Sequence, residues 1–274
     1  MISRTTALLA RRWVPTGILV ASVACTSALR EPAPIAELAA RRSSGRGAAE
    51  LINAANESWA KRDQAGQSAR AESDYLDAAE VDPAHIDALI GAMKAISFRI
   101  ERERGVDRAR LAETEVQLGQ WCLRRAPSAA ECDYRLAIAL GQQARERPST
   151  GHDALGKIVE LLHRAIAADP SLDSAGPDRV LSIVLVRAPG WPAGPGDVDA
   201  GLLHAVAAVA RYPDVASNQL ALATALEATG AADRARESYA RAFALLSAAQ
   251  ARGDPDATSL LADARNGLAH ASRP

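Results

Sequence analysis

The sequence predicts an all-α protein, a solenoid-like array of antiparallel helical hairpins with about 11 helices. Apolar residues make up 48% of the 274 residues and aromatic residues only 4%, so the apolar share is mostly Ala, Leu and Val. Ala and Leu are strong helix formers, and this composition is typical of an all-α protein. Prolines also recur at a near-constant spacing of 44, 43, 43 and 42 residues, at Pro83, Pro127, Pro170, Pro213 and Pro255.

Each of these prolines follows a helical pattern of apolar residues. Proline cannot continue a helix interior, and it moves the preceding residue away from the α region. A period of about 40 residues therefore indicates one helical hairpin per repeat. Helix breakers predict helices over 49–62, 66–82, 85–104, 106–126, 129–146, 153–169, 176–187, 197–211, 215–229, 231–249 and 256–271.

One segment in this series is ambiguous. Residues 180–186 read V-L-S-I-V-L-V, a β-prone run that could form a strand. A lone strand would have no partner in a helical chain, so we predict helix. By contrast, residues 231–249 show a clear apolar stripe that contains Tyr239 and Phe243, with arginines outside it.

The first 24 residues have the pattern of a signal peptide. Residues 1–13 carry three arginines and no acid, and residues 14–24 are uncharged and end in small residues. This apolar stretch is too short to span a bilayer. We therefore expect export, and removal of residues 1–24 would change the formal net charge from −1 to −4.

Cys25 directly follows this segment in the order Ser22-Val23-Ala24-Cys25. The order resembles a bacterial lipobox, in which the Cys is lipidated and becomes the first residue of the mature chain, although Ser22 stands where Leu is usual. The alternative is a plain signal peptide with an incidental Cys25. Lipidation predicts an anchor on the periplasmic face of a membrane, and Thr26 favours the outer membrane. Residues 25–48 are rich in Pro, Ser, Gly and charge, which predicts a flexible tether before a helical domain over 49–272, with a short helix near 35–42.

The other two cysteines, Cys122 and Cys132, flank Pro127 almost symmetrically. If Pro127 lies in the turn between two antiparallel helices, the cysteines face each other. An oxidising periplasm would then permit a disulfide, and the alternative is a pair of buried thiols.

The pattern before the prolines resembles the second helix of a tetratricopeptide repeat (TPR), which carries small-x3-aromatic-x2-small and a later Pro. Ala71, Tyr75, Ala78 and Pro83 match this pattern, and the segment around Tyr239 matches most of it. The observed period exceeds the 34 residues of that repeat, so a HEAT-like array, with a period of about 40–47, is the alternative.

No catalytic motif is present, so we predict no enzyme activity, no cofactor and no metal site. The sequence lacks a phosphate-binding loop, a nucleophile elbow and a C-x-x-C pair. The five histidines are scattered, without H-E-x-x-H spacing, at His85, His152, His163, His204 and His270. The charge balance offers no basic surplus for nucleic acid.

Residues 188–197 form a Pro- and Gly-rich loop around Trp191. An indole ring is unfavourable in water, so Trp191 either plugs the solenoid or lines a ligand or partner surface. Trp59 and Trp121 fall within predicted helices at core positions, which favours packing.

This region resembles the T component of TRAP transporters, a family of TPR-type periplasmic lipoproteins. The resemblance is carried by Gly176-Pro177-Asp178-Arg179-Val180-Leu181, by Arg187-Ala188-Pro189-Gly190-Trp191-Pro192, by Gly194-Pro195-Gly196-Asp197 and by Asn218-x-Leu220. The likeness covers most of 50–270 and is sharpest over about 170–245.

The resemblance implies a lipid-anchored, non-catalytic subunit that is often trimeric and works beside a periplasmic solute-binding protein to deliver a small organic ligand to a membrane permease. It also implies a ligand or partner surface formed by Gly176, Arg179, Pro189, Trp191, Pro192, Gly196 and Asp197. Without the resemblance, the same residues fit a general TPR scaffold lipoprotein that mediates protein–protein interactions in the cell envelope. Structural roles are the alternative for three of them: a charge pair for Arg179, a plug for Trp191 and a helix N-cap for Asp197.

Overall fold

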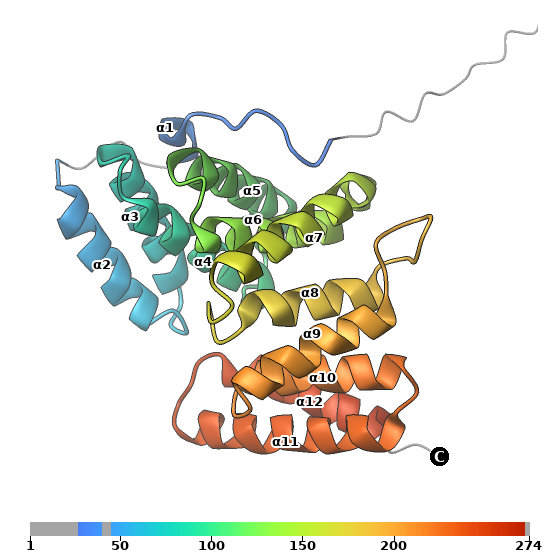
Figure 1. Ribbon diagram of the computed structural model, residues 1–274. Helices are drawn as coiled ribbons and strands as arrows, with labels where there is room; N and C mark the ends of the chain where they lie inside the picture. The colour runs from blue at the N-terminus through green and yellow to red at the C-terminus, as the bar shows by residue number, and fades with distance from the viewer. Residues whose placement is uncertain (1–26, 40–44, 272–274) are drawn as a thin grey trace, which may run out of the picture.

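A computed structural model describes residues 27–39 and 45–271, which form twelve α-helices and one 3-10 turn (Figure 1). The fold is all-α, as predicted, and consecutive helices pack as antiparallel hairpins. The helices are α1 (Ile35–Leu38), α2 (Ala48–Ala60), α3 (Gln67–Val81), α4 (Ile86–Arg102), α5 (Arg108–Arg125), α6 (Ala130–Glu146), the 3-10 turn η1 (Pro148–Thr150), α7 (Gly151–Ala168), α8 (Gly176–Arg187), α9 (Val198–Arg211), α10 (Ala216–Ala228), α11 (Ala232–Ala251) and α12 (Ala257–Ala271).

The periodic prolines lie in the turns that join one hairpin to the next, after α3, α5, α7, α9 and α11. The residue before the proline is extended in the turns that follow α3 and α7: Asp82 has φ −131° and Asp169 has φ −149°. The carboxylate of each Asp accepts a hydrogen bond from the main-chain N–H two residues on, at 2.9 Å and 2.8 Å. The same contact, at 2.8 Å, follows Asp254. These Asp-Pro pairs therefore fix the turn as well as end the helix.

Close packing between hairpins uses large residues against glycines. The ring of Tyr75 on α3 lies against Gly91 of α4, where a Cβ atom would come within 2.6 Å of the ring. Tyr239 on α11 meets Gly267 of α12 in the same way, with 2.3 Å to such a Cβ. The aromatic residue of the sequence pattern thus packs against a glycine of the next helix, and this contact lets the two helices approach closely.

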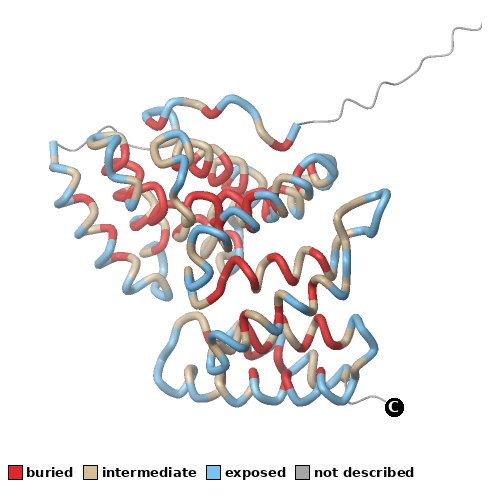
Figure 2. The backbone as a smooth tube through the Cα atoms, in the orientation of Figure 1, coloured by how far each residue is buried: buried red, intermediate tan, exposed pale blue. Residues whose placement is uncertain are grey.

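The β-prone run at 180–186 lies within α8, as predicted, because consecutive helices pack against both sides of it. Even-numbered helices also contact one another directly, α4 with α6, α8 with α10 and α10 with α12. The even-numbered helices therefore form one layer of the array and odd-numbered helices form the other. Burial follows this arrangement, since buried positions concentrate between the layers (Figure 2).

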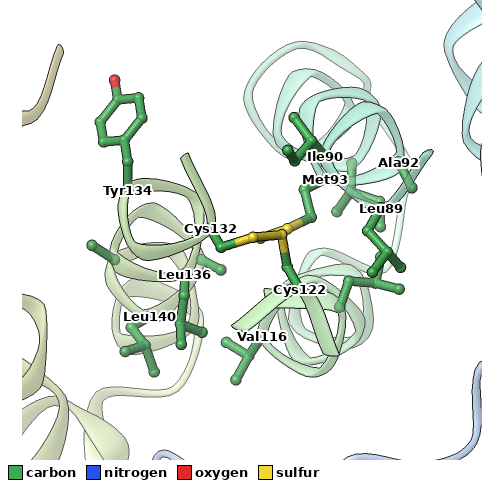
Figure 3. Packing of buried hydrophobic residues seen from close by; sticks show 14 of the residues in the cluster. Leu89, Ile90, Ala92, Met93, Val116, Cys122, Cys132, Tyr134, Leu136 and Leu140 are labelled. Carbon is green, nitrogen blue, oxygen red and sulfur yellow. A yellow bond between two sulfur atoms is a disulfide. The ribbon is translucent and has the colours of Figure 1, made fainter. Parts of the chain in front are cut away.

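The largest part of the core runs through α2–α8 and includes the two internal cysteines. Cys122 on α5 and Cys132 on α6 are fully buried and joined by a disulfide, with sulfur atoms 1.98 Å apart. Figure 3 shows the bond between the two helices, beside Met93 and Ile90 of α4. The Pro127 turn places the two residues opposite each other, which is the geometry that the sequence suggested.

The segment before α2 differs from the expected flexible tether over 25–48. Residues 27–34 lie in an extended conformation along α5. The side chain of Gln117 accepts a hydrogen bond from the N–H of Ala33 at 2.9 Å, and the indole N–H of Trp121 donates to the Ala33 carbonyl at 2.8 Å. Gln120 donates to the carbonyl of Arg30 at 2.8 Å. Because these side chains satisfy the backbone of the segment, it is bound to the fold. The described part of the expected helix near 35–42 is the short α1, Ile35–Leu38.

The signal segment and Cys25 lie outside the described residues. Within the described ranges, no helix combines the length and the apolar character needed to cross a membrane.

Candidate partner-binding site on the inner face

The even-numbered helices line a cavity of about 420 Å³, here called the N-terminal pocket. Its walls come from α2, α4 and α6, and also from the α7–α8 turn at Asp173 and the α11–α12 turn at Asp256. A cavity bounded by both the first and the last hairpins requires the array to curve around it. The even-numbered layer is therefore the inner, concave face.

Aromatic rings and guanidinium groups form the wall of the N-terminal pocket. Trp59 of α2 and Phe98 of α4 meet edge to face, with centroids 5.8 Å apart. Arg62 lies 4.7 Å from the centroid of Trp59, and Arg102 lies 5.6 Å from that of Phe98. Cation–π contacts of this kind hold the cations in place over the rings. The predicted packing role of Trp59 is confirmed, and its half-buried ring also faces the pocket.

Asp256 closes the array by joining its two ends. Its carboxylate accepts a hydrogen bond from Arg62 at 2.9 Å and lies 3.7 Å from Arg102. Arg102 also donates to the carbonyls of Pro255 and Asp256 at 3.3 Å and 3.2 Å. The side chains of Arg62 and Arg102 are only 16% and 22% exposed, whereas that of Asp256 is 46% exposed, so solvent still screens these contacts on the Asp256 side.

A second cavity of about 590 Å³, the C-terminal pocket, continues the inner face along α8, α10 and α12. Its lining combines apolar groups such as Ile183 and Leu220 with the cations Arg179 and Arg187. Asp263 and Asn266 of α12 add hydrogen-bonding groups. The lining of the C-terminal pocket is therefore mixed in polarity.

A hydrogen-bond network connects the two pockets. The hydroxyl of Tyr134 donates to the carboxylate of Asp173 at 2.7 Å, and Arg179 donates to the same carboxylate at 2.9 Å. Arg179 also donates to the side-chain oxygen of Asn218 on α10, at 2.9 Å. Burial raises the pKa of the Tyr134 hydroxyl, so that it stays a proton donor. Asp173 lines the first pocket and Arg179 lines the second, so the network fixes their relative position.

The network also holds a left-handed stretch of backbone in the α7–α8 turn. Asp173, Ser174 and Ala175 have φ values of 48°, 55° and 65°. Each such residue costs about 1–2 kcal/mol when it is not glycine. Asn218, fully buried, offsets this by donating to the Ser174 carbonyl at 3.0 Å, and Arg179 donates to the Asp173 carbonyl at 3.3 Å. Strain that surrounding contacts hold in place is typical of functional sites.

The structure separates the residues of the family-like motif into two groups. Gly176 and Arg179 belong to the network: a Cβ atom on Gly176 would lie 2.5 Å from the Tyr134 hydroxyl. Arg179 forms the charge pair with Asp173 that was one of its expected roles. The remaining residues belong to the α8–α9 loop and line neither pocket; they are Pro189, Trp191, Pro192, Gly196 and Asp197.

The α8–α9 loop is structured, and its Trp191 does not plug the solenoid. Trp191 is 89% exposed, since the loop extends outward and the core is filled by α7–α9 without it. Asp197 is the N-cap of α9, where its side chain accepts from the N–H of Ala200 at 2.9 Å, which was its alternative role. A Cβ atom on Gly196 would lie 2.1 Å from the carbonyl oxygen of Ala188, so only glycine fits there.

Sequence reasoning missed the residues that form the N-terminal pocket apart from Trp59. Arg62, Phe98, Arg102 and Asp256 lie far apart in the chain, and each resembles an ordinary residue on the surface of a helix or in a turn. The sequence gives only a weak signal, an arginine three residues after Trp59 and another four residues after Phe98. Within residues 27–39 and 45–271, no group of three or more His, Cys, Asp or Glu side chains could hold a metal ion.

The fold is similar to that of solved TPR proteins. A thermophilic TPR protein from Thermus thermophilus matches with a TM-score of 0.59 and 18% identity, over 81% of this chain and 100% of that chain. The MamA protein matches with a TM-score of 0.47 and 16% identity, over 74% and 93% of the two chains. YrrB, a TPR protein with an unusual peptide-binding site, matches with a TM-score of 0.44 and 18% identity, over 80% and 92%.

Of these likenesses, the first shows a TPR-like fold, and the other two are too distant to add to the argument. It favours the TPR reading of the period over the HEAT alternative. No protein-family model and no curated protein matches the chain. The resemblance to the TRAP transporter T component therefore stays a prediction from the sequence motif.

Proposed function

We propose that this protein is a non-catalytic TPR-type scaffold that holds a segment of a partner protein along its inner face. The observation that supports this proposal is the pair of cavities on the inner face. The N-terminal pocket is lined by α2, α4 and α6 and the C-terminal pocket by α8, α10 and α12, and the contact between Asp173 and Arg179 joins them. Together they offer aromatic, cationic and amide groups to a bound chain. Those groups suit a peptide, whose carbonyls and carboxylates accept hydrogen bonds and whose side chains bury against rings.

The partner segment would follow the even-numbered helices because cavities lie there on both sides of the network. The polar lining suits binding that depends on direct hydrogen bonds as well as on apolar burial. The fixed Tyr134–Asp173–Arg179 contacts would limit rearrangement on binding, and a preorganised surface loses less entropy when a partner binds.

The test is binding by variants of each pocket. Trp59→Ala removes a ring of the N-terminal pocket, and Arg187→Ala removes an exposed cation of the C-terminal pocket. Partners cross-linked to the full chain in cells would be identified and their affinity measured. We expect each variant to weaken binding by about tenfold, equivalent to about 1.4 kcal/mol. Arg236→Ala, on the exposed face of α11, is the matched control and should bind normally. Equal binding by all three variants would refute an inner-face site.

We also propose that the scaffold works in the bacterial cell envelope, tethered by a lipid on Cys25. The signal-like pattern of residues 1–24 supports this location, and a disulfide between Cys122 and Cys132 suits an oxidising compartment. The expected result is that Cys25→Ser releases the protein from membranes into the soluble periplasmic fraction. A Cys25→Ser variant that stays membrane-bound would exclude the lipid anchor.

The transport hypothesis is the finer form of this proposal, and only the sequence motifs within 176–220 support it. It predicts that the partner is a periplasmic solute-binding protein, that the subunit is trimeric, and that both co-purify with a permease from detergent extracts. Recovery of unrelated envelope proteins on the inner face, and no transport component, would leave the general scaffold as the function.

A further inference from the structure

The α8–α9 loop presents an indole ring to solvent on a fixed support. Residues 188–196 carry no charged side chain, and Trp191 within them is the most exposed of the large apolar residues that the structure describes. The backbone N–H of Gly196 donates to the carbonyl of Pro189 at 2.8 Å, and the backbone N–H of Asp197 donates to the carbonyl of Leu185 at 2.9 Å. Ala193 donates to the carbonyl of Gly190 at 3.0 Å. The backbone of the loop is thus held in place while its ring remains in water.

The loop lies at the same end of the helices as the start of the described chain. Because α6, α7, α8 and α9 pack in antiparallel order, the α6–α7 turn and the α8–α9 loop share one end of the array. Ser27 lines a cavity of about 340 Å³ with Arg147, Ser149 and Thr150 of the α6–α7 turn. Figure 1 shows the start of the described chain and the loop toward the same side of the molecule. Two interhelical spacings separate these features, on the order of 20 Å.

The bound N-terminal segment limits how far this end can lie from a membrane anchor. Cys25 precedes Ser27 by two residues, which span at most about 7 Å when extended. The contacts of residues 30–33 with α5 tie the segment to the fold. A lipid on Cys25 would therefore bring the α6–α7 end of the array to the bilayer surface.

We infer that the α8–α9 loop is a second membrane contact, in which Trp191 enters the headgroup region beside the lipid on Cys25. Trp is favoured at membrane–water interfaces, because its ring is apolar while its N–H can still bond to polar groups. The uncharged loop avoids the unfavourable desolvation of charges on approach to lipid. Two contact points would restrict the motion of the array on the membrane to rotation about the line that joins them. This inference depends on the lipidation of Cys25 proposed above and is independent of peptide binding.

Quenching of Trp fluorescence by brominated lipids tests this contact. The mature lipidated protein is reconstituted on phosphatidylethanolamine–phosphatidylglycerol vesicles, with or without bromine on the acyl chains. We expect vesicle-dependent quenching that is lost in Trp191→Phe and kept in Trp59→Phe, whose ring lies in the inner face. Since Trp191 is 89% exposed, its replacement leaves the fold unchanged, and circular dichroism would verify this.

The outcomes separate this inference from the other proposals. If the protein floats with the vesicles and quenching is equal in the wild type and Trp191→Phe, only the loop contact is overturned. Flotation without any quenching also overturns it, because the ring then lies outside the bilayer. Failure to float overturns the anchor and the loop contact together, whereas partner binding by the pocket variants is measured separately.

Discussion

Replacing Glu115 by Gln should change how the stability of this protein depends on pH. Glu115 lies on α5 with no exposed surface. Ser97 donates to one of its carboxylate oxygens at 2.6 Å, and the other has no hydrogen-bond partner among the described residues. Burial raises its pKa from the ordinary value of 4.5 to about 8, opposed by the bond from Ser97 and by the charge of Arg135.

The direction of the pH effect follows from which state holds the proton. Between pH 4.5 and pH 8 the folded protein keeps Glu115 protonated, whereas the unfolded chain releases that proton. The stabilisation that depends on the Glu115 proton is therefore complete below pH 4.5, and it is lost as the pH rises through this window. Each pKa unit corresponds to about 1.4 kcal/mol, so the loss between pH 5 and pH 9 is on the order of 4 kcal/mol.

Glu115→Gln removes the titrating proton and keeps the shape of the side chain. The assay is urea unfolding at pH 5, 7 and 9, followed by circular dichroism. We expect the variant to gain on the order of 4 kcal/mol relative to the wild-type protein between the lowest and the highest pH. Glu237→Gln, the same change on an exposed face of α11, controls for the loss of one formal charge.

Two results would refute this reasoning. A stability difference between wild type and Glu115→Gln that is constant across pH 5–9 would mean that Glu115 is ionised in the folded protein at pH 5. An equal pH-dependent change in Glu237→Gln would assign the effect to overall charge and not to burial.

Three further perturbations test the core and the network. Reducing the Cys122–Cys132 bond should lower the free energy of unfolding by about 3 kcal/mol, which is the value of the chain-entropy model for cysteines ten residues apart. Urea unfolding with and without reductant measures this loss. The Cys122→Ala/Cys132→Ala double variant is the control and should not respond to reductant. Asn218→Ala removes the side-chain amide that donates to three backbone carbonyls, and it should lower the free energy of unfolding by about 3 kcal/mol in the same assay. A loss below the error of the fit would contradict the role of Asn218 in holding the turn. Gly176→Ala brings a methyl group against the Tyr134 hydroxyl and should cost about 1–3 kcal/mol, so an unchanged urea midpoint would argue against that contact.

The helical array was predictable because its signals are local. The Asp-Pro turn after Asp82 was assigned from neighbouring residues alone, and the helix limits agree within a few residues. The β-prone run in α8 is the exception, because its own residues allowed a strand and only the helical pattern of the rest of the chain favoured a helix. The candidate site was not predictable in the same way. Arg62 and Asp256 are 194 residues apart in the chain, and no local pattern marks them as neighbours.

The α7–α8 turn shows why local reasoning ends where it does. Three consecutive non-glycine residues are left-handed there, against their intrinsic preference, because Tyr134 and Asn218 from other hairpins hold the turn by hydrogen bonds. The tether expectation was wrong over residues 27–39 for a similar reason. Its Pro- and Ser-rich composition resembles a linker, whereas the glutamines and the indole that bind its backbone lie on α5.

By itself, the sequence determined the fold class, the hairpin period and the facing positions of Cys122 and Cys132, because proline, alanine and side-chain periodicity act over a few residues. Only the tertiary structure decided that the first and last hairpins meet through Asp256, that Arg179 joins the two pockets, and that Trp191 remains exposed. Those features depend on how small differences in packing between successive hairpins add up to curvature. The curvature brings distant charges together, and no single segment of the chain encodes it.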